Sequence, residues 1–147
     1  EIAAASDVYK RQQKEYRLED QIGFKLRLAN QKHLDVFSRL MPEVTPTQFA
    51  VLAKLSETGH ISQNHLGRLV KMDAATTKGV IDRLKKKGFV LSTPSQTDLR
   101  RLEISLTEDG RIYTLNAVKT AHSISDKTAT NLSPRELERL LALLDKL

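Results

Sequence analysis

The sequence predicts a mainly α-helical fold that carries one small β-hairpin. Apolar residues recur every three or four positions over several long segments, which is the spacing of amphipathic helices. Ser, Thr or Asp residues able to cap a helix precede most of these segments, and Pro or Gly closes several of them. One stretch instead alternates apolar and polar residues on both sides of a polar turn, as a two-stranded hairpin does.

Two helices are expected in the first third of the chain. The first covers residues 18–40, where one stripe of residues at helical spacing comprises Leu18, Ile22, Leu26, Ala29, His33, Val36, Phe37 and Leu40. Thr45 is placed to cap the second helix, with Pro46 at the first helical position and Gln48 completing a capping box. This second helix is expected to end before Gly59.

The middle of the chain predicts a helix-turn-helix. Ser62 is placed to cap a short helix, and Asp73 is placed to cap a second helix over residues 74–87 that ends at Gly88. Two helices joined by so few residues are typical of this motif. On the second helix, Val80, Ile81 and Leu84 are expected to face the core, with Thr77 at the edge of that face.

A hairpin and two further helices complete the chain. The strands flank "SQTDL" at residues 95–99, and the second strand is expected to point Leu102, Ile104 and Leu106 inward and Arg101, Glu103 and Ser105 outward. Thr107 is placed to cap a long helix that follows. Ser133 and Glu136 form another capping box, which opens a helix whose apolar face comprises Leu137, Leu140, Leu141 and Leu144.

Composition excludes several classes of protein. The 147 residues fit one domain, or a small domain with helical extensions. The sequence begins at Glu1 rather than at a methionine, so we expect that some N-terminal residues of the native chain precede it. No cysteine is present, which excludes thiol catalysis and disulfides, and no apolar run or signal peptide indicates a membrane, so a cytoplasmic protein is expected. The chain has no catalytic motif and no histidines at convincing ligand spacing, so we expect neither an enzyme, a metal site nor a cofactor.

Positive charge is concentrated in the helix-turn-helix and the hairpin. Residues 71–101 hold eight Lys and Arg against three Asp, a surplus of five in a chain whose net charge is +6. Phosphate contacts supply most non-specific DNA affinity, so double-stranded DNA is expected to dock here. The alternative is that the run "KKK" complements the helix dipole and is simply solvated.

The exposed face of the second helix suits the major groove. Ala75 and Gly79 are small enough to allow close approach, and Lys78 is long enough to reach a guanine edge. Alternatively, these small residues serve only tight helix packing.

At the hairpin tip, the planar guanidinium of an arginine fits a narrow minor groove, and Asp98 is placed to hold the guanidinium of Arg100. The alternative there is an ordinary polar turn.

The motifs "DRLKKKG" and "DLRRLEISLTEDG" resemble the MarR family of bacterial winged helix-turn-helix repressors. The resemblance extends from about Leu18 to Leu147 and implies a homodimer on a pseudo-palindromic operator. It assigns residues 45–106 to DNA binding and residues 1–44 and 107–147 to helical dimerisation. The resemblance implies DNA contacts by Ala75, Thr76, Thr77 and Lys78 of the second helix and by Asp98 and Arg100 of the wing. It further implies that Arg83 and Arg101 contact the DNA backbone.

The leucine stripes of the terminal helices independently predict a dimer, because one small domain cannot cover them. They can instead pack on each other within one chain.

Members of this family commonly bind small aromatic acids. The candidate residues for such an effector are Phe24, Arg27, Asn30, His33, Phe37 and Phe49. His33 is alternatively a core or interface residue, and His122 offers a second candidate.

The sequence therefore predicts a repressor released by a small aromatic acid of the benzoate, phenolic or pyridine-carboxylate type. Two alternatives stay open: a winged-helix module that binds an acidic protein, and a DNA-binding regulator with no effector. The sequence identifies neither the operator nor the target genes, nor the direction of an effector's action.

Overall fold

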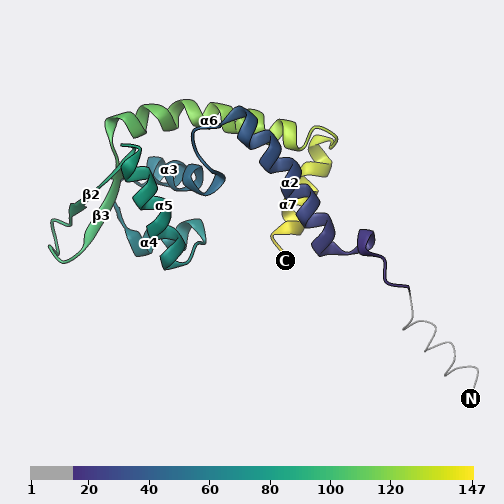
Figure 1. The fold of residues 1–147 in the computed structure, drawn as a ribbon, viewed down its shortest axis with the longest axis horizontal. Helices are drawn as coiled ribbons and strands as arrows, with labels where there is room; N and C mark the ends of the chain where they lie inside the picture. The colour runs from purple at the N-terminus through teal and green to yellow at the C-terminus, as the bar shows by residue number, and fades with distance from the viewer. Residues whose placement is uncertain (1–14) are drawn as a thin grey trace, which may run out of the picture. The chain divides into compact units, whose positions relative to one another are not determined.

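The computed structural model describes residues 15–147 and confirms a mainly helical fold with a small sheet (Figure 1). The chain divides into two compact units at the peptide bond between His33 and Leu34. The helices are the 3₁₀ turn η1 (Leu18–Asp20), α2 (Ile22–Leu40), α3 (Pro46–Thr58), α4 (Gln63–Val70), α5 (Ala74–Lys86), α6 (Glu108–Thr128) and α7 (Pro134–Leu144). The strands are β1 (Ile61–Ser62), β2 (Val90–Pro94) and β3 (Leu102–Leu106).

The predicted start of the first helix is wrong by about one turn. Leu18 begins a short 3₁₀ turn, and α2 starts only at Ile22 because Gln21 between them has an extended backbone. Apolar spacing marks the face of a helix, but it does not mark the residue at which the backbone becomes helical.

The predicted helix N-caps are all confirmed. Each capping side chain accepts a hydrogen bond from the backbone N–H three residues ahead, which satisfies one of the free donors of the first turn. The five caps are Thr45, Ser62, Asp73, Thr107 and Ser133, and those at Thr45 and Ser133 are complete capping boxes.

The sheet contains a strand, β1, that was not predicted from the sequence. The order is β1-β3-β2, with Ile61 of β1 and Ser92 of β2 both opposite Ile104 of the central strand. Two residues of β1 are too few to produce a recognisable alternation. In Figure 1 the β2 and β3 hairpin extends beyond α4 and α5 as a wing.

The predicted alternation of β3 is wrong at two positions. Leu102 is 54% exposed, because it lies nearer the wing tip than the two residues that pair with β1. Ser105 is only 6% exposed, and it belongs to a strand that both α3 and α6 contact. Ile104 is buried as expected.

The core joins α3, α4, α5 and β3. The face predicted for the second helix of the motif is confirmed, because Val80, Ile81 and Leu84 are buried; Thr77, expected at the edge of this face, is buried as well. The start of α6 is tied to the turn after α5: the Thr107 hydroxyl donates to the Gly88 carbonyl oxygen (2.6 Å) and the Thr107 N–H donates to that of Phe89 (3.0 Å). These bonds fix where α6 leaves the winged domain.

Candidate nucleic-acid interface

Helix α5 exposes small and basic side chains at its N-terminal end. Asp73 accepts the Thr76 backbone N–H at 2.7 Å, and this hydrogen bond lowers the pKa of Asp73. The cap therefore stays ionised and holds the first turn, from which Ala75 and Thr76 project to solvent.

Lys78 lies one turn further along α5 and carries an exchangeable ion pair. Its ammonium is 2.7 Å from the Asp82 carboxylate, and this hydrogen bond lowers the pKa of Asp82. Both side chains are well exposed, so the pair contributes little stability in water. Lys78 can therefore exchange Asp82 for a base edge or a phosphate at small cost.

The expected DNA contact of Thr77 is wrong. Its side chain is 1% exposed, and its hydroxyl donates to the Asp73 carbonyl oxygen at 2.8 Å. A Cβ placed on Gly67 of α4 would come within 2.9 Å of that hydroxyl oxygen. Thr77 therefore closes the packing between α4 and α5, and its neighbours Thr76 and Lys78 form the exposed surface.

The wing tip also differs from the expectation. Asp98 does not hold the guanidinium of Arg100; its carboxylate accepts the Arg100 backbone N–H (3.0 Å) and lies 3.8 Å from the Arg101 side chain. An aspartate in a turn commonly bonds the N–H two residues ahead, which explains the difference. Among residues 15–147 the Arg100 guanidinium has no hydrogen-bond or ion-pair partner, so it is available to DNA.

A hollow of about 440 Å³ separates the start of α4 from the wing, and we call it the wing hollow. It brings Arg68 of α4 together with Arg100 and Arg101, and its polar lining also includes Ser62, Gln63 and Asn64. Gln63, Asn64 and Arg68 were not predicted from the sequence as site residues. The sequence could have indicated Arg68, because the first helix of a helix-turn-helix crosses the DNA backbone and an arginine on that helix is a candidate phosphate contact.

The eight cations of residues 71–101 are all exposed, but Lys87 is held apart from the others. Its ammonium donates to the Glu43 carbonyl oxygen at 2.5 Å, in the loop that precedes α3. The Glu43 carboxylate in turn accepts the Tyr113 hydroxyl at 3.4 Å. Burial, reinforced by this carboxylate, raises the pKa of Tyr113 to about 12, so the phenol stays protonated at neutral pH.

The predicted effector residues lie in both units of the chain. In the unit that ends at His33, the Arg27 guanidinium lies 5.2 Å from the Phe24 ring centre. In the other unit, the Phe37 and Phe49 rings are 6.3 Å apart, and Phe37 is a buried core residue. Phe49 lines a hollow of about 400 Å³ between α3 and α6, which His122 also lines. Asn30 is exposed and His33 half-buried.

Two further features are absent from the described part of the chain, residues 15–147. No helix in it is long and apolar enough to cross a membrane. Nor does it bring together three or more His, Cys, Asp or Glu side chains in a way that could hold a metal ion.

A helix-turn-helix whose second helix has an exposed, partly basic face, followed by a hairpin whose tip arginine has no side-chain partner within residues 15–147, defines a winged helix-turn-helix DNA-binding protein. The sequence profile of the MarR family matches residues 44–102. The HTH-type transcriptional repressor NicR of Pseudomonas putida is 32% identical over 134 residues, which span 90% of this chain and 85% of NicR. The chain belongs to the MarR family and is a MarR-like transcriptional repressor.

Solved structures agree with this assignment. A probable transcriptional regulator from Pseudomonas aeruginosa is 45% identical, with a TM-score of 0.83 over 88% of this chain and 98% of that one. BpsR of Bordetella bronchiseptica, whose DNA binding is regulated by 6-hydroxynicotinic acid, is 33% identical, with a TM-score of 0.84 over 89% of this chain and 95% of BpsR. Members of this family are transcription regulators rather than enzymes.

Proposed function

We propose that this protein is a cytoplasmic, homodimeric repressor that binds a pseudo-palindromic operator and is released by a small aromatic acid. In this arrangement α5 lies in the major groove, where Ala75, Thr76 and Lys78 contact base edges. Arg100 enters the neighbouring minor groove, and Arg68, Arg83 and Arg101 contact phosphates. The observation that carries the DNA-binding part is the Arg100 guanidinium, which has no partner within residues 15–147 and lines the wing hollow together with Arg68 and Arg101.

Replacing Arg100 with alanine is expected to weaken operator binding by roughly 1–3 kcal/mol, because the variant loses a groove or phosphate contact. Fluorescence anisotropy with a labelled operator, obtained by genomic footprinting of the protein, measures the change. The matched control is Arg39→Ala, which removes the same charge from an exposed position on α2. If both variants bind as the wild type does, the wing does not contact DNA.

The salt dependence separates DNA binding from the alternative of a protein-binding module. Release of counterions from several phosphates gives a steep log–log slope of affinity against salt, which a weak protein contact need not give. Arg68→Ala is expected to lower this slope by about one, since a single phosphate contact is lost.

The terminal helices support the dimer. No residue of α7 is buried. Three leucines of the predicted stripe, Leu140, Leu141 and Leu144, are well exposed, and the fourth, Leu137, is half-buried. Apolar surface of this kind is expected to be covered by a second copy. Two copies then place their α5 helices about one DNA turn apart, roughly 34 Å, which the half-sites of the operator require.

The effector proposal rests on BpsR and on the residue types of the predicted site. Arg27 and His33 can supply positive or hydrogen-bonding groups for a carboxylate, and Phe49 and His122 line an open hollow beside α6. An acid that binds the DNA-free conformation more tightly than the DNA-bound one shifts the protein off its operator, whereas equal affinity shifts nothing.

We expect 6-hydroxynicotinic acid, a benzoate or a hydroxycinnamate to release the operator complex of the wild type, and His33→Ala to need a higher concentration. The titration is followed by anisotropy, with His122→Ala in parallel to compare the two histidines. Release of wild type and His33→Ala at the same concentration would show that His33 is only a packing residue. If no acid releases either protein, the regulator acts without such an effector.

A further inference from the structure

Helix α5 carries one acidic side chain among its cations. Asp82 is the only Asp or Glu of this helix, which also holds four Lys and Arg residues. Cations bind the phosphates of DNA, and an anion on the same surface weakens that binding. Attraction to the DNA backbone therefore does not account for a carboxylate on this helix.

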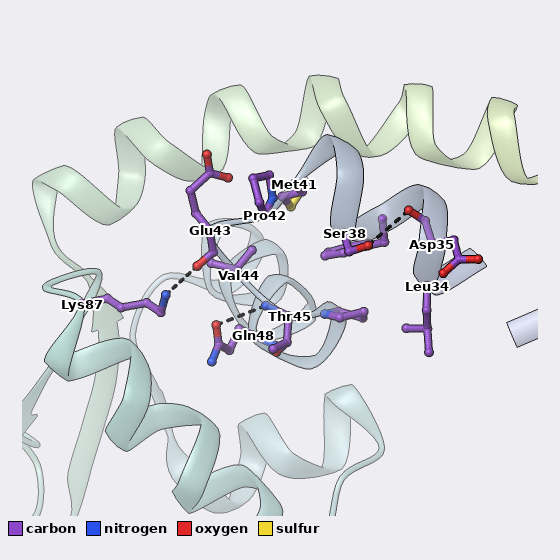
Figure 2. Close-up of a pocket in the computed structure, with 12 residues that line it drawn as sticks. Leu34, Asp35, Ser38, Met41, Pro42, Glu43, Val44, Thr45, Gln48 and Lys87 are labelled. Carbon is purple, nitrogen blue, oxygen red and sulfur yellow. Dashed lines mark hydrogen bonds between the residues drawn. The ribbon is translucent and has the colours of Figure 1, made fainter. Parts of the chain in front are cut away.

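Asp82 lies one helical turn after Lys78 and accepts a hydrogen bond from its ammonium at 2.7 Å. The two side chains are 46% and 66% exposed, and Ala75 precedes them on the same face of α5. Lys87, which directly follows the helix, differs because its ammonium donates to the Glu43 carbonyl oxygen of the loop before α3 (Figure 2). Lys87 is thus held by the fold, whereas Lys78 and Asp82 remain at the surface that a duplex meets.

Helix stability does not explain the pair either. At this spacing the stabilising order places the acid before the base, which matches the helix dipole, and here the lysine comes first. The hydrogen bond from Lys78 lowers the pKa of Asp82, and the charges of Lys85 and Lys86 add to the effect. The carboxylate is therefore ionised at neutral pH when DNA approaches.

Entry of α5 into the major groove changes what surrounds this pair. The Lys78 ammonium can move from Asp82 to a base acceptor at little cost in water, but the Asp82 carboxylate then loses its partner inside an interface. An ionised group without a partner is costly where water is displaced, so the carboxylate requires a hydrogen-bond donor from the DNA. Phosphate oxygens only accept, and the donors of the major groove are the amino groups of cytosine and adenine.

We infer that Lys78 and Asp82 together read one G·C base pair in each half-site of the operator. The ammonium donates to N7 and O6 of the guanine, and the carboxylate accepts from the N4 amino group of the cytosine. A G·C pair presents these groups in the order acceptor, acceptor, donor. An A·T pair places its amino group between two acceptors, so it does not match a cation and an anion side by side.

This inference rests on the proposed docking of α5 in the major groove, and it assigns Asp82 a role there. The Asp82 carboxylate lowers affinity for every phosphate nearby and recovers a hydrogen bond only where a cytosine amino group lies in reach. Asp82 is therefore a specificity-determining residue rather than a source of affinity. Selectivity of this kind depends on a penalty at the wrong sites as well as on a contact at the right one.

The test measures affinity and base preference together by fluorescence anisotropy. The duplexes are the footprinted operator, versions in which each G·C pair of the half-sites is changed in turn to A·T, and an unrelated duplex of the same length. The wild type is expected to lose roughly tenfold in affinity at one G·C position of each half-site. Asp82→Ala is expected to lose this preference and to bind the unrelated duplex severalfold more tightly, because an anion facing the phosphates is removed.

Two controls isolate the pair. Asp109→Ala removes the same charge from an exposed position at the start of α6 and is expected to keep the wild-type preference. Lys86→Ala removes a cation from the same helix and is expected to weaken binding to all the duplexes alike. Lys78 and Asp82 are exposed, so their variants are expected to unfold at the wild-type temperature, which circular dichroism measures.

Variants of both side chains show whether they act on one base pair. Lys78→Ala is expected to lose the preference at the same position as Asp82→Ala, and the double variant is expected to lose no more than either single variant. The inference is overturned if Asp82→Ala keeps the preference, if Asp109→Ala loses it too, or if the two single variants lose it at different positions. A wild type that binds no duplex would instead contradict the proposed function itself, and this inference with it.

Discussion

Replacing Gly110 with alanine is expected to destabilise the folded protein by about 3 kcal/mol, the upper end of the usual range for overpacking. A Cβ at this position would lie 1.9 Å from the Phe89 carbonyl oxygen and 2.8 Å from its carbonyl carbon. Both are backbone atoms, so no side-chain rotation relieves the clash. Moving them strains the bond between the Thr107 N–H and the Phe89 carbonyl, which ties α6 to the turn after α5.

Urea unfolding followed by circular dichroism measures this loss of stability. Gly23→Ala is the matched control, because Gly23 lies in α2 and a Cβ there meets nothing within 4 Å. The control is expected to gain about 0.5–1 kcal/mol from the better helix propensity of alanine. Equal stability of Gly110→Ala and wild type would show that α6 is not held closely against Phe89 in solution.

The double variant Leu141→Glu/Leu144→Glu is expected to convert the proposed dimer to a monomer and to weaken operator binding roughly 10²–10⁴-fold, because one domain then reads a single half-site. Leu141 and Leu144 of α7 are 55% and 40% exposed. In a dimer these side chains are buried, and an unpaired carboxylate in their place pays a large desolvation penalty. In a monomer the same substitutions stay at the surface and cost little.

Sedimentation velocity at micromolar concentration distinguishes the two outcomes. Leu99→Glu, which makes the same change at an exposed leucine of the wing, is expected to remain dimeric and serves as the control for oligomeric state. A wild-type protein that sediments as a folded monomer would contradict the proposed dimer, and so would a double variant that remains dimeric.

The five capped helix starts and the helix-turn-helix were correctly predicted because they rest on contacts between near neighbours in the chain. Thr45, Ser62, Asp73, Thr107 and Ser133 each cap a backbone N–H three residues away. Such a bond forms wherever the local sequence allows it, so the residue types alone predict it. The buried face of α5 follows from helical periodicity in the same way.

The composition of the candidate site depended instead on contacts between distant segments. Arg68 joins Arg100 only because α4 and the wing meet, and Lys87 bonds to Glu43 across a separation of 44 residues. Thr77 is withdrawn from the surface by close contact with Gly67 of another helix. No periodicity encodes such meetings, because they result from the packing of complete elements, and packing therefore decided which polar groups stay free for DNA or for a ligand.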